Sequence, residues 1–391
     1  MFDSEIVWFC SFLGLFKKFY RAEFNSKKRF ICIAYNLTDY SGFKLHAGEV
    51  PEMRANEVMS ICLRVLLILV FTPDLSRAAG MEYLGSRLKG NYVWGGAMNL
   101  AWHEMTENVL HSKLELNTGD EAALEMADEF NRSPFSKNDL DEKSYYVKSG
   151  FGQGTLNIIN KESRLKFPGK SFGDINAKLG PQDFISYAYF LKQVEYLTQF
   201  EEKRVNFGKK IVQGFYASNG SQRNNVRVLE YSDDDRFIIG LKLKDKGDEL
   251  LLAKGFDMGN PEAVVSRIAQ YGRGGFPTMG ASDRFEMPKL HLQYRRDYNE
   301  LINKPFSNKG FEGYVIAMMF ENIKFDMDQK GARVENEAVI GGRGAARRAK
   351  PVNVRKFILD KPFWVVMKRQ DKQYPYFLLG VENTALMQKV D

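Results

Sequence analysis

Residues 323–338 alternate between two kinds of side chain, and this alternation constrains the fold more than any other feature of the sequence. Apolar Ile323, Phe325 and Met327 are separated by charged residues, as in a strand that buries one face. Gly331 then offers the backbone freedom for the chain to turn back. We therefore expect a sheet that holds this strand with one face in the core.

The alternation resumes after Gly331 with small or medium side chains. On one side of this second segment lie Ala332, Val334, Asn336 and Ala338. The intervening residues are charged, so one side could enter a core while the other faces solvent. Val334 is bulky for a narrow slot, and Asn336 would need a hydrogen-bond partner there. The same pattern also fits an ordinary edge strand followed by a loop.

The composition is that of a folded protein with a large core. The chain has 391 residues, of which 44% are hydrophobic and 27% are charged. Its formal net charge of +7 is compatible with binding to a polyanion, and equally with a solvated basic surface. The sequence contains no run of aromatic residues interleaved with arginines, so no base-stacking surface for nucleic acid is predicted.

The N-terminal part resembles a processed leader that begins at Met53. A basic start, the apolar run 65–71 and the small residues of 76–78 have the order of a signal peptide. The apolar run is too short to span a membrane as a helix. We therefore predict a signal peptide at 53–78, a secreted or periplasmic domain at 79–391 and no membrane contact once the leader is removed. Residues 1–52 would be a non-native or disordered extension, or alternatively an amphipathic extension or a membrane anchor.

The predicted mature chain carries no catalytic, metal or cofactor site that its motifs reveal. Cys10, Cys32 and Cys62 all precede residue 79, so no thiol would remain. His103 lacks the second histidine of a zinc-binding helix, and no nucleophile motif is present. The three acids at 233–235 are interpreted as a turn in preference to a calcium site. We expect a protein that is not an enzyme.

Local patterns predict the following elements. Helices are expected at 93–109, 120–130, 155–166, 248–254 and 260–269, the last capped by Asn260. Strands are expected at 145–147 and 184–198, in a hairpin over 226–243, and throughout the chain after Met287. The glycines at 150, 152 and 154 are interpreted as a turn.

Six segments, taken in order, resemble motifs of the serpins. They are Ile159-Asn160 with Gly169-Lys170, Phe190-Leu191-Lys192 with Tyr196 and Phe200, the hairpin that begins at 228–231, Met287-Pro288-Lys289-Leu290 with Asp297-Tyr298, Lys361-Pro362-Phe363, and 377–383. The resemblance covers roughly residues 150–383, and the helix at 93–109 is similar to the first helix of that family.

The resemblance implies a single α+β domain with a large mixed β-sheet, smaller sheets and surrounding helices. It also implies a monomeric inhibitor of a serine protease, which cleaves an exposed loop that then inserts into the large sheet. The hinge of that loop would be Gly331, Ala332, Val334, Asn336 and Ala338. The alternatives are a non-inhibitory binding protein of the same fold, or a protein that binds polyanions through its basic loop.

The sequence departs from the serpins at two places that matter for insertion. Residues 329–332 read Gln-Lys-Gly-Ala, where the family has Glu-Glu-Gly-Thr. Glu321 and Asn322 stand where the family has a histidine. The stretch between the first helix and residue 150 is also shorter than in the family, so helices there are shortened or absent.

The basic segment 341–350 has the composition of an exposed bait loop. Family spacing, counted from both ends, places the cleaved bond between Ala345 and Pro351. Arg348 is the preferred candidate because small Ala349 follows it, and Arg347 is the second. An arginine can pair through two hydrogen bonds with a carboxylate in a specificity pocket, so the expected target is a trypsin-like protease.

Overall fold

The computed structural model describes residues 84–271, 275–332 and 354–390, together with the backbones of three N-terminal strands. The chain divides into two compact units, Met1–Leu75 and Ser76–Asp391. The first contains a three-stranded antiparallel sheet of β1 (Val7–Leu13), β2 (Phe16–Phe24) and β3 (Phe30–Asn36). The predicted leader at 53–78 lies outside the described residues. No helix among the described residues has the length and apolarity needed to cross a membrane.

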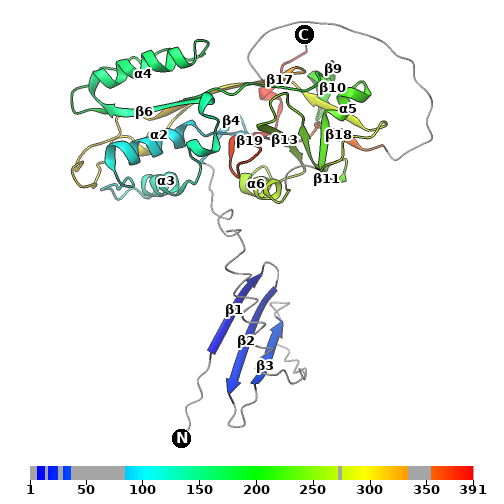
Figure 1. Ribbon diagram of the computed structural model, residues 1–391, viewed down its shortest axis with the longest axis horizontal. Coiled ribbons are helices and arrows are strands. Elements are labelled where there is room, and N and C mark those ends of the chain that lie inside the picture. The colour runs from blue at the N-terminus through cyan, green and yellow to red at the C-terminus, as the bar shows by residue number, and fades with distance from the viewer. Residues whose placement is uncertain are drawn as a thin grey trace. The chain divides into compact units, whose positions relative to one another are not determined.

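Seven antiparallel strands form the largest sheet of the second unit, in the order β11-β12-β13-β19-β20-β5-β4 (Figure 1). They are β4 (Ser86–Leu88), β5 (Asn91–Gly95), β11 (Val226–Asp233), β12 (Arg236–Leu241), β13 (Asp248–Lys254), β19 (Phe363–Arg369) and β20 (Pro375–Val381). The predicted hairpin over 226–243 is confirmed as β11 and β12. The Lys-Pro-Phe segment leads into β19, and the segment at 377–383 supplies most of β20.

The helix predicted at 248–254 is wrong, because this segment is the central strand β13. Leu250, Leu251 and Leu252 are all buried, since both faces of β13 are covered and it pairs with β12 and β19. A short apolar run without a clear period fits a buried helix and a buried strand equally well. Pairing with the two neighbouring strands makes this segment a strand. One of these, β19, lies more than a hundred residues further along the chain.

A four-stranded sheet packs against the seven-stranded one to form the main core. It has the order β18-β14-β10-β9, with β9 (Glu201–Phe207), β10 (Lys210–Tyr216), β14 (Arg284–Pro288) and β18 (Lys356–Ile358). Phe357 of β18 stacks edge-on against Phe237 of β12 at a centroid distance of 5.3 Å, and both rings are fully buried. Aromatic pairs of this kind add specificity to the burial of apolar area.

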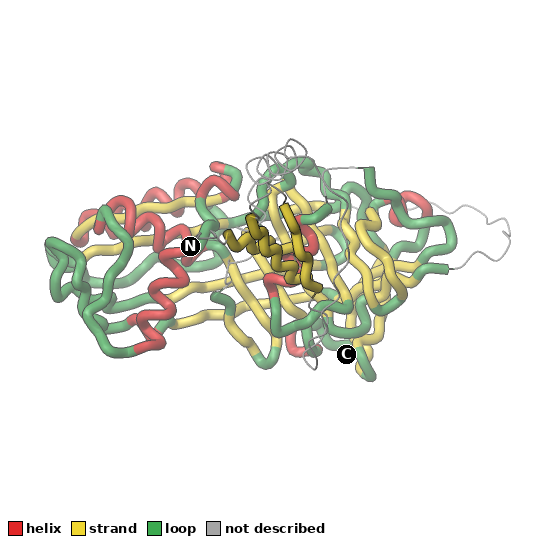
Figure 2. The backbone as a smooth tube through the Cα atoms, turned by 90° about the horizontal axis from the view of Figure 1, so that it is seen from below, coloured by secondary structure: helices red, strands yellow, loops and turns green. Residues whose placement is uncertain are grey.

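The other part of the unit is helical on both faces of a narrow sheet (Figures 1 and 2). Its sheets are β6-β7 and β15-β16-β17-β8, built from β6 (Tyr145–Phe151), β7 (Phe184–Phe190), β8 (Val194–Glu195), β15 (Leu290–Asp297), β16 (Phe320–Met327) and β17 (Gly331–Ala332). The helices are α2 (Ala97–Met105), α3 (Glu121–Arg132) and α4 (Gly152–Lys166); α5 (Gly220–Asn224) and α6 (Pro261–Ala269) lie with the other sheets.

Several predicted elements shift at their ends. The helix expected at 93–109 is α2 followed by a π-helical turn, Thr106–Leu110, and its first residues belong to β5. The single strand expected at 184–198 is interrupted between β7 and β8. The glycine triplet is not only a turn, because Gly152 begins α4 with a φ of 71° and Gly154 lies within its first turn. Asn260 caps α6 as predicted, accepting a hydrogen bond from the Ala263 amide at 2.9 Å.

These elements make an α+β architecture, with one large sheet, smaller sheets and surrounding helices.

Candidate functional site

The basic loop is the predicted functional segment, and the structure describes the two places where it is held. Its N-terminal end is β17 and its C-terminal end is β18 (Figure 1). Arg347 and Arg348, like Val334, Asn336 and Ala338, lie outside the described residues. Gly331 and Ala332 are described, and they form the N-terminal anchor.

The N-terminal anchor is a tight turn that places β17 between two strands. The Asp328 amide donates to the Gly331 carbonyl at 2.9 Å, and Asp328 Oδ1 accepts from the Lys330 amide at 2.7 Å. Ala332 pairs with Met327 of β16 on one side and with Val194 of β8 on the other. The first two hinge residues are thus already a central strand of their sheet, and Ala332 is only 3% exposed.

Gly331 is required here for space. We expected a glycine because the chain turns back, yet Gly331 is not among the residues with a positive φ. A Cβ on Gly331 would lie 2.2 Å from the Val194 carbonyl oxygen, which is backbone and cannot move aside. Close approach to β8 therefore excludes any side chain at this position.

A buried aromatic cluster supports the anchor from below. The Tyr196 amide donates to the Lys330 carbonyl at 3.1 Å, and the Phe200 amide donates to that of Gln329 at 2.9 Å. The Tyr196 and Phe200 rings lie 5.1 Å apart, and Phe200 also contacts Phe285. Complete burial raises the pKa of Tyr196 well above its usual value. The motif that contains Tyr196 and Phe200 thus fixes the place from which the loop departs.

Below β17 lie the ends of two separate sheets, β6-β7 and β15-β16-β17-β8, and neither is part of the seven-stranded sheet, which is the largest. Among the described residues, no backbone hydrogen bond joins β7 to β16, although β8 continues from β7 and is linked to β16 through β17. Helix α2 lies behind both strands. Ser186 of β7 donates to the Ala101 carbonyl at 2.6 Å, and the Met98 amide of α2 interacts with Glu321 of β16. Both strands thus contact one helix, and among the described residues β7 has a strand neighbour on one side only and β16 is paired with β17 at a single position.

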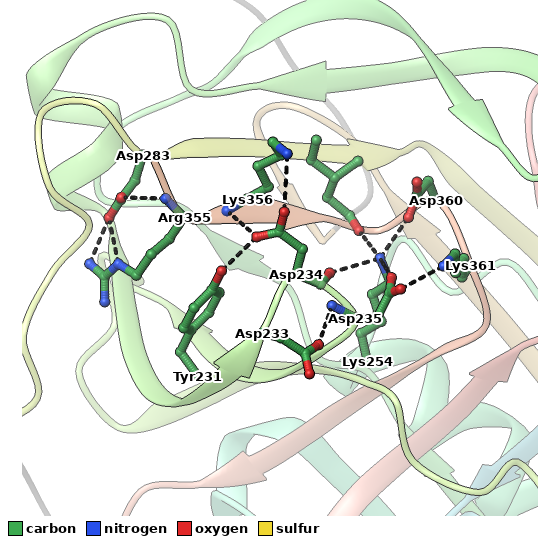
Figure 3. Close-up of polar contacts among 11 residues, drawn as sticks. Tyr231, Asp233, Asp234, Asp235, Lys254, Asp283, Arg355, Lys356, Asp360 and Lys361 are labelled. Atoms are coloured by element: carbon green, nitrogen blue, oxygen red, sulfur yellow. Dashed lines mark hydrogen bonds and ion pairs between the residues drawn. The ribbon is translucent and has the colours of Figure 1, made fainter. Parts of the chain in front are cut away.

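The C-terminal anchor is an ion pair between Arg355 and Asp283 (Figure 3). Asp283 Oδ2 accepts from Arg355 Nη2 at 2.6 Å and from Nε at 3.0 Å, while Oδ1 accepts from the Arg355 amide at 3.2 Å. Asp283 is itself held in a turn, where Oδ2 also accepts from the Gly280 amide at 2.7 Å. Because both guanidinium donors converge on one oxygen of a buried carboxylate and the Arg355 amide binds the other, this pair sets where the chain re-enters the fold.

The acidic turn at 233–235 continues the anchor along β18 (Figure 3). Asp234 accepts hydrogen bonds from the Tyr231 hydroxyl at 2.5 Å and from the Lys356 amide at 3.0 Å, and both lower the pKa of Asp234. Asp233 closes the turn by accepting from the Asp235 amide at 2.7 Å. The turn between β11 and β12 is confirmed, and two of its carboxylates bind lysines.

Lys254, at the end of β13, joins this turn to the strand that follows the loop. It is 2% exposed, and its Nζ lies 2.6 Å from Asp360, 3.0 Å from Asp235 and 2.9 Å from the Ile358 carbonyl. A buried ammonium of this kind is tolerated only with such partners. In the described part of the chain no group of three histidine, cysteine or acidic residues is placed to hold a metal ion.

Sequence reasoning missed the residues of the C-terminal anchor. Asp283 and Arg355 are 72 positions apart, and nothing in the residues around either one indicates a pair. Asp328 is one of the charged residues of the alternating segment, and this pattern does not predict its role in the turn with Lys330 and Gly331. Tyr196 is the exception, since the motif at 190–200 pointed to it.

We expect Asp283→Asn to weaken the C-terminal anchor. The substitution removes the negative charge that accepts both guanidinium hydrogen bonds, so the charge of Arg355 would be left without an ionic partner at this position. Because the arginine side chain is about one-third exposed, we expect a loss of only about 1–2 kcal/mol in the free energy of unfolding. Urea denaturation measures this loss. As a control, Asp371→Asn, at an exposed site, should change the stability by less than about 0.5 kcal/mol. Equal effects of the two substitutions would contradict the anchor.

Comparison with solved structures finds serpins. The native thermophilic serpin tengpin is 12% identical, with a TM-score of 0.48 over 78% of this chain and 91% of tengpin. Serpin48 of the insect Tenebrio molitor is 14% identical, with a TM-score of 0.42 over 74% of this chain and 91% of that one. Thyroxine-binding globulin in complex with thyroxine is 13% identical, with a TM-score of 0.39 over 63% and 77%.

No family model matches the chain, and no curated protein matches it. The six segments that resemble serpin motifs lie in the described sheets and helices, and β17 and β18 bound the segment 333–353, which lies outside the described residues.

Proposed function

We propose that this protein inhibits a serine protease, and that cleavage of residues 333–353 allows their first part to insert between β7 and β16. The observation that carries the proposal is β17. This strand already lies between β16 and β8, and among the described residues β7 and the lower part of β16 each have an unpaired edge. Unpaired edges inside a sheet offer a row of backbone donors and acceptors that a further strand could satisfy.

The register of β17 agrees with the side-chain pattern of the loop. Met327 pairs with Ala332. Continued in the same register, Val334 would lie opposite Phe325, and Ala338 would lie opposite Glu321. The described residues at these positions of β16 face the core, and Met327, Phe325 and Glu321 are all buried. The small side of the loop would therefore meet the buried face of the strand.

Charges on the opposite face also match in this register. Arg333 would lie opposite Asp326, and Glu335 would lie opposite Lys324. Cross-strand pairs of opposite charge stabilise a sheet by about 0.2–1 kcal/mol each, whereas like charges would oppose pairing. A shift of the register by two residues in one direction would place Glu335 opposite Asp326, and a shift by two in the other direction would place Arg333 opposite Lys324. Both shifts bring like charges together. The complementary charges thus favour one inserted register.

A trypsin-like target is proposed from the basic segment 341–350. In limited digestion with trypsin, the first cut should follow Arg348, or Arg347, before any cut within the sheets. An arginine in an extended loop reaches the protease, whereas arginines such as Arg227 and Arg355 are held by carboxylates. Mass spectrometry of early fragments identifies the site. If the loop resists while other segments are cut, a non-inhibitory binding protein becomes the better description.

Two other functions remain as alternatives to the inhibitor. The bulk of Val334 and the polar Asn336 favour a serpin-like binding protein whose loop is not inserted. Polyanion binding by the basic segment would be favoured by salt-dependent retention on heparin. An increase in the melting temperature of the protein after cleavage of the loop is expected for the inhibitor and not for either alternative.

Export of the protein is part of the same proposal. Residues 53–78 have the pattern of a signal peptide, so the secreted protein should begin near Ala79 and contain no cysteine. N-terminal sequencing of the secreted product measures this directly. Residues 1–52 found in that product would exclude the leader.

A further inference from the structure

Glu321, in the second position of β16, is a buried acid that the proposed insertion does not use. Its side chain is 7% exposed, and Oε2 accepts one hydrogen bond from the Tyr298 hydroxyl at 3.2 Å. Oε1 is fully buried and has no hydrogen-bond partner in good geometry. It lies against Gly95, where a Cβ would be 3.2 Å away. The carboxyl is thus enclosed between β5, β15, β16 and α2.

No cation neutralises this carboxyl among the described residues. Arg296 is its cross-strand partner on β15, but Arg296 Nη1 donates to the Leu84 carbonyl at 2.8 Å and to that of Gly85 at 3.2 Å. The Arg296 guanidinium also stacks on the Tyr298 ring, 4.1 Å from its centre. Nη1 is therefore occupied by these two carbonyls, and Arg296 forms no ion pair with Glu321 although its charge lowers the pKa of the carboxyl.

The other ionisable groups nearby are also occupied elsewhere. On α2, His103 contacts the Ser133 carbonyl and Glu104 lies by Ser149 of β6. On β5, the Tyr92 ring packs against Trp364. Tyr294, on β15, is half-buried and packs against the main core. None of these supplies a positive charge in contact with Glu321.

The surroundings favour the neutral acid. Burial raises the pKa of Glu321 to about 7, and the Tyr298 hydroxyl, the Met98 amide and Arg296 only partly oppose this effect. Ionisation in the closed structure is costly, because the charge would be buried with only the Tyr298 hydroxyl and the Met98 amide as donors and without an ion pair among the described residues. Water could solvate the charge if β16 separated from α2.

We propose that Glu321 is a proton-operated lock that holds the first residues of β16 against α2 when it is neutral and favours their separation when it is ionised. The lock is a property of the described residues alone. Only the role of the lock in loop insertion rests on the proposed function: separation of β16 from α2 would make the edge of β16 that faces the inserting strand more accessible.

The direction of the pH dependence follows from the two states. In the closed state the pKa is about 7, whereas an exposed glutamate titrates near its ordinary value of 4.5. Between these values each unit of pH raises the equilibrium constant for opening by up to tenfold, and above about pH 7 it is constant. The expected total change is on the order of a hundredfold.

Hydrogen exchange of the intact, uncleaved protein tests the lock. Exchange of β16 and α2 amides, corrected for the intrinsic rate at each pH from 5 to 8.5, should rise on the order of a hundredfold and then level off. Glu321→Gln, which cannot ionise, should abolish this rise. Tyr298→Phe keeps the ring but removes the donor to the carboxylate, so it should move the midpoint to higher pH.

Glu286→Gln is the matched control. Glu286 is also a buried glutamate on a strand, but it pairs with Lys203 at 2.7 Å and its pKa is lowered. This variant should leave the pH dependence of β16 unchanged. A rise that persists in Glu321→Gln, or a midpoint unmoved by Tyr298→Phe, would overturn the lock. Because no cleavage is involved, failure of loop insertion would leave this result intact, and failure of the lock would leave insertion untouched.

Discussion

Ala338→Asp is expected to abolish inhibition while the loop is still cleaved. In the register that continues from β17, Ala338 would face the core opposite Glu321, which is buried and forms no ion pair with a described residue. A carboxylate inserted there would be desolvated beside a second acid, at a cost of several kcal/mol. Insertion should then be slower than release of the protease, so the variant becomes a substrate.

The matched control for this prediction is Glu337→Lys. Residue 337 is the outward neighbour in the same segment, so a change of charge there should be tolerated. Both variants are incubated with trypsin, and the fraction that forms an SDS-resistant complex is compared with the fraction that is only cleaved. Inhibition by Ala338→Asp at the level of the unmodified protein would mean that this side of the loop does not enter the core.

The alternating pattern predicted the path of the chain better than any other local signal. The strand at 323–327 is β16, with Phe325 and Met327 buried as expected. The hairpin β11–β12 and the cap of α6 were also predicted, because each depends on residues that are close in sequence. Such elements carry their own turn and cap chemistry, and distant parts of the chain do not change them.

The sequence-based predictions were wrong or incomplete where a residue's structure depends on partners that are distant in the sequence. The segment 248–254 became a strand because β12 and β19 flank it, and Gly331 is required by the Val194 carbonyl. Asp283 pairs with Arg355, which lies 72 residues further along the chain, beyond the segment that the structure does not describe. The local sequence does not indicate which backbone atoms a side chain at a given position would meet, such as the Val194 carbonyl oxygen that would lie 2.2 Å from a Cβ on residue 331. The same holds for Glu321, whose enclosure by four elements could not be inferred from its neighbours in the chain.

The second large effect is expected when the loop is cut. Continuation of β17 through Ala338 would pair six further residues with strands on both sides. At about 1 kcal/mol per backbone hydrogen bond, with the burial of Val334 in addition, the gain should be roughly 5–10 kcal/mol. In a domain of this size we expect the melting temperature to rise by about 10 °C or more. An ordinary loop that is cut should instead leave the stability unchanged or lower it.

Thermal unfolding of the protein before and after cleavage at Arg347 or Arg348 tests insertion most directly. Calorimetry of the intact protein, of the cleaved protein and of cleaved Ala338→Asp requires no knowledge of the natural protease. If the loop enters between β7 and β16, the cleaved protein melts about 10 °C or more above the intact one, and cleaved Ala338→Asp does not. Equal melting temperatures for the intact and cleaved protein would contradict insertion, and with it the proposed inhibitory mechanism.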